Sequence, residues 1–247
     1  MVGGRRAVAE ALRSGKAKRV LAVSGTHRTE GMRDVTDAAR RADLDIEWVD
    51  RQAVEAFRLI DDQGVVALVR PPVELTDREV AAFGFPEDAV VVVLDGIVDP
   101  QNFGACARSA EAAGASMLIT RERRAAPLTP AAVRASAGAL LHLPVARVTN
   151  VTRSLERLRD RGFFVVGLDH RAEVSVDQAS PAPRPLALVV GAEGSGMTRL
   201  VRDTCDLLVS IPMRGRVASL NASAALAVAL FGYALVRPQR DPDGAER

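Results

Sequence analysis

A continuous run of β-branched residues constrains the fold of this chain more than any other feature. Residues Ala89–Leu94 read Ala-Val-Val-Val-Val-Leu, a pattern typical of a strand buried on both faces of a parallel sheet. Further apolar runs follow, separated by helical patterns or polar loops. They are Met117–Ile119, Val145–Val148, Phe163–Leu168, Leu186–Val190 and Leu207–Met213. This alternation predicts an α/β fold with a mostly parallel, helix-covered sheet. One of the helices is predicted over Pro130–Leu141.

The beginning of the chain repeats this alternation on a smaller scale. Roughly the first 70 residues read as α-β-α-β-α-β, after which two consecutive prolines interrupt the pattern. We therefore expect a small α/β domain over residues 1–70, a linker over 71–88 and a second domain over 89–236. The polar tail, residues 237–247, is expected to be disordered.

Charge is distributed unevenly along the chain. The whole sequence has a net charge of only +2, but residues 1–33 carry eight basic side chains against two acidic ones, a net charge of +6. A basic end of this kind indicates either a surface that meets a polyanion or an arginine-rich solvated surface. Charge alone does not separate these two interpretations.

Several classes of protein are disfavoured by composition. The two cysteines form no CxxC pair, and the three histidines are scattered, so no metal-ligand spacing is present. The N-terminus lacks the apolar segment of a signal peptide. The apolar stretch near 220–236 is interrupted by polar residues and is short for a membrane span. We therefore expect a cytoplasmic protein without a metal.

Three loops at the ends of predicted strands are candidates for a binding site, because open α/β sheets bind ligands beyond the carboxyl ends of their strands. They are Asp95–Gly104, Gly191–Gly196 and Pro212–Ser223. The second has G-x-x-G-x-G spacing, which is not the dinucleotide fingerprint, and it lacks a Walker lysine. The third leads into a long apolar helix, so its Ser and Asn residues fit a helix cap as well as a ligand loop.

Taken together, the three loops resemble the motifs of the SpoU (TrmH-like) family of RNA ribose 2′-O-methyltransferases, in the SPOUT class. The resemblance is carried by Asn102-x-Gly104-x-x-x-Arg108, by Val190–Met197, and by Ile211-Pro-Met with Ser219–Ser223. The front part resembles the substrate-binding domain of the ribosomal-RNA members, which is similar to ribosomal protein L30e. Asp62 stands where that family has a histidine.

The resemblance implies a trefoil-knotted C-terminal domain that holds S-adenosylmethionine. Backbone groups at Gly191, Ile211 and Leu220 are then expected to bind this cofactor, with Met213 and Gly196 beside them. It also implies a catalytic site. The catalytic residues that it implies are Asn102, Arg108, Glu193, Ser219 and Asn221.

The chemistry of arginine restricts the role of Arg108. Guanidinium stays protonated at ordinary pH, so it is a poor general base. Methyl transfer from a sulfonium is an in-line displacement in which positioning matters greatly. We hypothesise that Arg108 orients the ribose or its phosphate and stabilises charge on O2′, while Glu193 holds the guanidinium.

Within the family, the N-terminal domain favours ribosomal RNA as the substrate. The resemblance implies a guanosine of 23S rRNA, which is the family's commonest assignment for this layout. A transfer-RNA 2′-O-methyltransferase and an antibiotic-resistance rRNA methylase are alternatives of the same class. A catalytically inactive RNA-binding module is an alternative of another class. The family also implies a homodimer with active sites built from both subunits.

Overall fold

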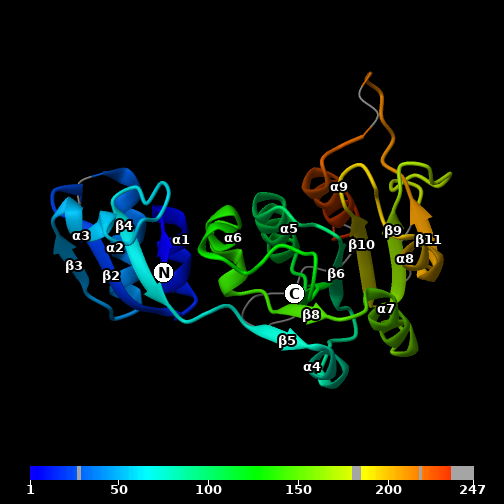
Figure 1. Cartoon of the computed structure of the whole chain (residues 1–247), viewed down its shortest axis with the longest axis horizontal. Coiled ribbons are helices and arrows are strands. Elements are labelled where there is room, and N and C mark those ends of the chain that lie inside the picture. The colour runs from blue at the N-terminus through cyan, green and yellow to red at the C-terminus, as the bar shows by residue number, and fades with distance from the viewer. Residues whose placement is uncertain (27–28, 180–184, 217–218, 235–247) are drawn as a thin grey trace, which may run out of the picture.

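The computed structural model describes residues 1–26, 29–179, 185–216 and 219–234, and it contains two sheets that lie side by side (Figure 1). The predicted tail over 237–247 lies outside the described residues. No helix in the described ranges is both long and apolar enough to span a bilayer.

The first sheet has four strands in the order β1-β4-β2-β3. Its strands are β1 (Val2–Gly3), β2 (Ala17–Val23), β3 (Ile46–Val49) and β4 (Val65–Val69). Strand β2 pairs parallel with β3 and antiparallel with β4. The helices of this unit are α1 (Arg5–Arg13), α2 (Glu30–Arg41) and α3 (Arg51–Glu55). Helices α1 and α2 bury apolar residues at helical spacing and pack against each other.

The second sheet has seven strands in the order β11-β9-β10-β6-β7-β8-β5, and every neighbouring pair is parallel. Its strands are β5 (Glu74–Thr76), β6 (Val90–Asp95), β7 (Met117–Arg121), β8 (Val145–Val148), β9 (Phe164–Leu168), β10 (Leu186–Gly191) and β11 (Leu207–Val209). Its helices are α4 (Asp77–Ala82), α5 (Pro100–Ala112), α6 (Pro130–Ala135), α7 (Val151–Asp160), α8 (Arg199–Thr204), α9 (Ala222–Ala234) and the 3₁₀ helix η2 (Ala139–Leu141). The predicted α/β fold with a parallel sheet is confirmed.

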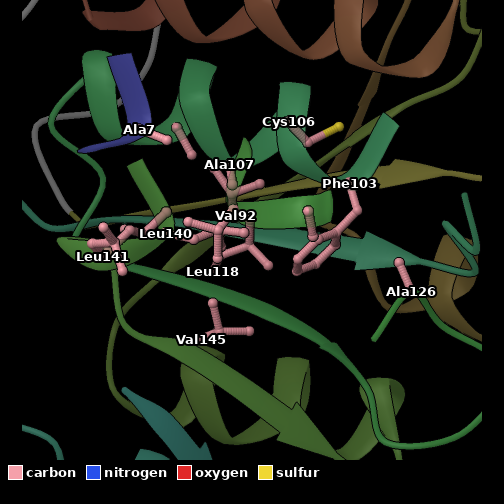
Figure 2. Packing of buried hydrophobic residues seen from close by; sticks show 14 of the residues in the cluster. Ala7, Val92, Phe103, Cys106, Ala107, Leu118, Ala126, Leu140, Leu141 and Val145 are labelled. Carbon is pink, nitrogen blue, oxygen red and sulfur yellow. The ribbon is translucent and has the colours of Figure 1, made fainter. Parts of the chain in front are cut away.

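The continuous apolar run is explained by the position of β6 at the centre of this sheet. All six residues of β6 are buried, and successive side chains point to opposite faces. Val92 belongs to the core on the face covered by α5, whereas Val91 and Val93 belong to the core on the other face. Figure 2 shows Phe103 and Ala107 packed over Val92.

Two expectations for this half of the chain need correction. The expected linker over 71–88 contains β5, which pairs with β8, and α4, which starts with a capping box between Thr76 and Glu79. A three-residue strand is too short to give a periodic signal. The helix read from the sequence over Pro130–Leu141 is broken, because Ala137 and Gly138 have positive φ values of 52° and 95°.

The break after α6 brings the chain against the first sheet's unit. A Cβ atom at Gly138 would lie 2.4 Å from the Cβ of Glu10, so only glycine fits there. His142 Nε2 lies 3.2 Å from Glu10 Oε2, and Arg134 donates to the backbone oxygen of Ile60. The buried core runs across this junction, where Ala7 of α1 belongs to the same cluster as Leu140 (Figure 2).

Candidate active site

Helix α5 starts at Pro100, inside the stretch Asp95–Gly104 that the sequence predicts to be a loop. Asp99 is its N-cap and accepts a hydrogen bond from the Asn102 backbone N–H (2.8 Å), with Pro100 at the first helical position. Asn102 therefore lies in the first turn of a helix and not in a loop. From there its Nδ2 donates to Glu193 Oε1 at 3.2 Å.

Glu193 is presented by a tight turn that follows β10. Ala192 and Gly196 exchange backbone hydrogen bonds of 3.2 and 2.9 Å, and Gly194 and Gly196 have positive φ values. A Cβ at Gly191 would lie 2.1 Å from the Gly196 carbonyl carbon. The three glycines thus allow the chain to fold back on itself, which is a sufficient reason for their spacing.

Asn221 has two roles in the structure. Its Oδ1 accepts from the Ser223 backbone N–H (2.9 Å) and hydroxyl (2.6 Å), as expected of a cap on α9. Its Nδ2 donates to Asn102 Oδ1 at 2.9 Å and to Glu193 Oε1. The cap and the site interpretations therefore hold together. We call Asn102, Glu193 and Asn221 the amide–carboxylate cluster.

Beside this cluster lies a cavity of about 270 Å³, here called the strand-end cavity. It lies among the segments that follow β9, β10 and β11, together with the start of α9. Its lining includes these residues singled out from the sequence: Gly191, Glu193, Gly196, Ile211, Met213, Ser219 and Leu220. The structure thus brings all five expected cofactor residues to one cavity.

The chemistry of the strand-end cavity fits a nucleoside with a positively charged sulfonium. Within the described residues, no hydrogen bond occupies the backbone groups of Ile211 or Leu220, so these groups are available to a ligand. The side chains of Met213 and Leu220 are each 38% exposed and offer apolar surface. The carboxylates in its lining are those of Glu193 and Asp169, and they supply negative charge for the sulfonium. Apolar walls with a few polar groups are typical of cofactor sites.

Arg108 lies elsewhere. It is exposed, six residues beyond Asn102 on α5, which is about 9 Å along a helix axis. Within the described part of the chain no hydrogen bond or ion pair joins it to Glu193, whose oxygen is instead occupied by the two amides. The expected contact between Glu193 and the guanidinium is therefore wrong within a single chain. Arg108 lines a second cavity, at the junction of the two sheet units.

Cys106 lies in the same helix but is a poor candidate for a nucleophile. Burial, with a smaller contribution from the Glu193 carboxylate, raises the pKa of the Cys106 thiol to about 12. A thiol with such a pKa stays protonated at neutral pH and is a weak nucleophile. Among the described residues there is also no group of three or more His, Cys, Asp or Glu side chains arranged to hold a metal ion.

Comparison with known proteins agrees with this geometry. Residues 89–231 match the SpoU rRNA methylase family, and residues 1–75 match the RNA 2′-O ribose methyltransferase substrate-binding family. A Bacillus subtilis protein assigned to the TrmH family of tRNA/rRNA methyltransferases is 39% identical over 98% of this chain and 96% of its own length.

The chain belongs to the SpoU methylase family.

Two further proteins similar to this SpoU methylase are informative. The 23S rRNA (guanosine-2′-O-)-methyltransferase of Photobacterium profundum is 43% identical over 68% of this chain and 69% of its own. The SpoU methyltransferase AviRb of Streptomyces viridochromogenes, solved with AdoMet, superposes with a TM-score of 0.73. It is 28% identical, over 95% of this chain and 88% of its own. The present chain is an S-adenosylmethionine-dependent RNA 2′-O-ribose methyltransferase.

Sequence reasoning missed one buried group of this SpoU methylase. Asp95, at the end of β6, is 2% exposed and accepts from Arg121 Nε (2.8 Å) and from the Thr198 backbone N–H (2.7 Å) and hydroxyl (2.9 Å). It ties the ends of β6 and β7 to the start of α8. An aspartate directly after a continuous buried strand was the available signal.

Asp62, the residue in place of the family's histidine, has a structural role. It is 7% exposed, and its Oδ1 accepts from the Gly64 backbone N–H at 2.7 Å. Its backbone oxygen accepts from Gly4 and Val65. This side chain therefore stabilises the turn before β4, and little of it is available for RNA.

Proposed function

We propose that this SpoU methylase transfers a methyl group to the ribose 2′-hydroxyl of a guanosine in 23S rRNA. The observation that carries the proposal is the amide–carboxylate cluster at the edge of the strand-end cavity, formed by residues from three separate motifs. The assignment to 23S rRNA is supported by the Photobacterium relative and by the match of residues 1–75 to a substrate-binding family.

In this proposal the strand-end cavity holds S-adenosylmethionine, which supplies the methyl group on a sulfonium. Backbone groups of Gly191, Ile211 and Leu220 bind it, with Met213 and Gly196 beside them. Glu193, kept in place by the amides of Asn102 and Asn221, faces the positive charge. Ser219, on the cavity wall, hydrogen-bonds the ribose of the substrate.

Arg108 acts on the substrate oxygen. Because guanidinium cannot act as a free base, it stabilises charge that develops on O2′ and orients the adjacent phosphate. Arg108 is not joined to the amide–carboxylate cluster of its own chain. We therefore propose a homodimer in which Arg108 of one subunit completes the site of the other. Val228 and Phe231 on α9, 45% and 42% exposed, give this helix apolar surface for such a contact.

We also propose the family's division of the chain, with a ribosomal-protein-L30e-like RNA-binding domain before the strand β5 and a knotted methyltransferase domain after it. Two observations support the knot. Residues from the segments 190–196, 209–213 and 219–225 line the same cavity, and the AdoMet-bound SpoU structure superposes over 95% of the chain.

The function is tested in two steps. Calorimetry first measures binding of S-adenosylmethionine to the purified protein. Ribosomal and transfer RNA from a strain that lacks the enzyme are then incubated with the protein and the cofactor, and 2′-O-methylation is mapped in 23S rRNA and in transfer RNA. We expect one newly methylated guanosine. Methylation of transfer RNA instead would overturn the ribosomal assignment, and cofactor binding without methylation of any RNA would favour an inactive binding module.

Sharing of the active site between subunits has a separate test. Arg108→Ala and Glu193→Gln chains are co-expressed with different tags, and the mixed dimer is purified. If sites are shared, one of its two sites contains both native residues and is active. If each chain works alone, both sites carry a defect and the mixed dimer is inactive.

A further inference from the structure

The cavity at the junction of the two sheet units is unlike the strand-end cavity in its chemistry. It has a volume of about 590 Å³ and lies between the start of α1, the start of α2 and helices α5 and α6. Four arginines line it, from both sheet units. These are Arg5, Arg6, Arg108 and Arg134. We call it the junction cavity.

Three of these guanidiniums lack a partner within the described ranges. The side chains of Arg5, Arg6 and Arg108 make no hydrogen bond or ion pair there, and the Nε of Arg5 is buried without an acceptor. Two aspartates also line the cavity, Asp34 and Asp61, and the first is paired with Arg13. A buried donor without an acceptor costs free energy, and the excess of guanidiniums over carboxylates favours an anion in the cavity.

Backbone groups add to this preference. Helix α1 begins at Arg5, and its N-cap, Gly4, has no side chain to accept a hydrogen bond. The N–H groups of Arg6 and Ala7 have no acceptor among the described residues, and both residues line the cavity. Free N–H groups at the start of a helix favour a phosphate.

Space for Arg5 is provided by a glycine. A Cβ atom at Gly31, in the first turn of α2, would lie 2.7 Å from Arg5 Cδ and 2.9 Å from its terminal nitrogen. Glycine within a helix is less favourable than alanine by about 1 kcal/mol. Its presence at this position is explained by the room that the Arg5 guanidinium needs.

We propose that the junction cavity binds a backbone phosphate of the substrate RNA, close to the nucleotide that is methylated. This rests on the proposed function, since Arg108 belongs both to this cavity and to the proposed methyl-transfer site. Arg5 and Arg6 belong to the unit of the first sheet, and Arg108 and Arg134 belong to the unit of the second. A phosphate that binds all four arginines fixes the RNA to both units at once.

Salt dependence of RNA binding tests the proposal. The affinity for 23S rRNA from a strain lacking the enzyme is measured over a series of chloride concentrations, for the full-length protein and for Arg5→Gln and Arg134→Gln. Each variant is expected to bind about 5- to 10-fold more weakly, with a slope of log affinity against log salt shallower by about 0.7. The KM for RNA rises, kcat at saturating RNA stays within about 2-fold, and cofactor affinity is unchanged.

Two further variants separate this role from a general loss of charge or of folding. Arg41→Gln removes one exposed charge at the opposite end of α2 and is expected to change RNA affinity less than about 2-fold. Gly31→Ala favours the helix but displaces Arg5, so it is expected to keep the melting temperature and weaken RNA binding. Inorganic phosphate, at constant ionic strength, competes with RNA on the native protein and competes less on Arg5→Gln.

The proposal is overturned if Arg5→Gln and Arg134→Gln keep the native salt slope and affinity. It is also overturned if Arg41→Gln weakens binding as much as they do. Failure of the proposed function looks different. In that case the native protein methylates no RNA, while the salt slopes still report whether the cavity holds a phosphate.

Discussion

The two cavities of this SpoU methylase are connected by one helix but are built in different ways. Asn102, in the first turn of α5, reaches Glu193 at the strand-end cavity, and Arg108, about 9 Å further on, reaches the junction cavity. The first cavity is assembled from loops at neighbouring strand ends, apolar residues and backbone groups. The second is assembled from arginines of two sheet units. The first suits a cofactor, and the second suits a polyanion.

The largest effect on activity is expected at Arg108, which belongs both to the junction cavity and to the proposed methyl-transfer site. Arg108→Ala removes the proposed stabilisation of charge on O2′ and is expected to lower kcat about 1000-fold, about 4 kcal/mol. Single-turnover methylation of rRNA measures this, and calorimetry should find unchanged cofactor affinity. Arg108→Lys should recover little, because lysine cannot make a two-nitrogen contact. Nearly full activity of the lysine variant would contradict that contact.

The next effect separates the two roles of Asn221 at the strand-end cavity. Asn221→Ser keeps an oxygen to cap α9 but loses the amide that donates to Asn102 and Glu193, so kcat/KM should fall about 100-fold, about 2.7 kcal/mol. Its stability should stay near that of the native protein. Asn221→Ala loses the cap as well, which should lower the free energy of unfolding by about 1 kcal/mol. Chemical denaturation and methylation assays on both variants make the comparison. Equal activity of the serine and native proteins would leave Asn221 as a cap alone.

A smaller effect is expected from opening the junction. Gly138→Ala places a Cβ 2.4 Å from Glu10 Cβ, so it should push the two sheet units apart. We expect RNA affinity to fall about 10-fold as the junction arginines separate, with cofactor affinity unchanged. Gly114→Ala is the control, since Gly114 also has a positive φ but nothing lies within 4 Å of its Cβ position. Equal losses in both variants would indicate backbone strain alone.

The smallest effect on activity is expected from thiol modification. With the pKa of Cys106 near 12 and that of Cys205 also raised by burial to about 12, few thiolates exist at pH 8. Iodoacetamide should label the folded protein much more slowly than the unfolded one, where the ordinary value is 9.0, and leave activity intact. The folded state also keeps these protons more tightly, so their contribution to stability should fall as pH rises from about 9 toward 12. Rapid labelling at pH 8 would contradict this.

The sequence predicted the fold well where periodicity is long. The parallel sheet could be read from Ala89–Leu94 and the later apolar runs, because a strand buried on both faces leaves no polar alternation. Strand β5 and the break at Ala137 could not be read. The first is too short for a pattern, and the second places residues at positive φ to fit a contact with Glu10, which is distant in sequence.

For the candidate site, the sequence alone identified the loops but not their contacts. The residue types of Asn102, Glu193 and Asn221, with their place at strand ends, were available before the structure. Their mutual hydrogen bonds join positions up to 119 residues apart, and only the order of strands in the sheet brings such positions together. Arg108 was singled out with them, but the periodicity of α5 directs its side chain to another cavity. The amide–carboxylate cluster and the four-arginine junction are therefore tertiary properties, decided by which surfaces pack together.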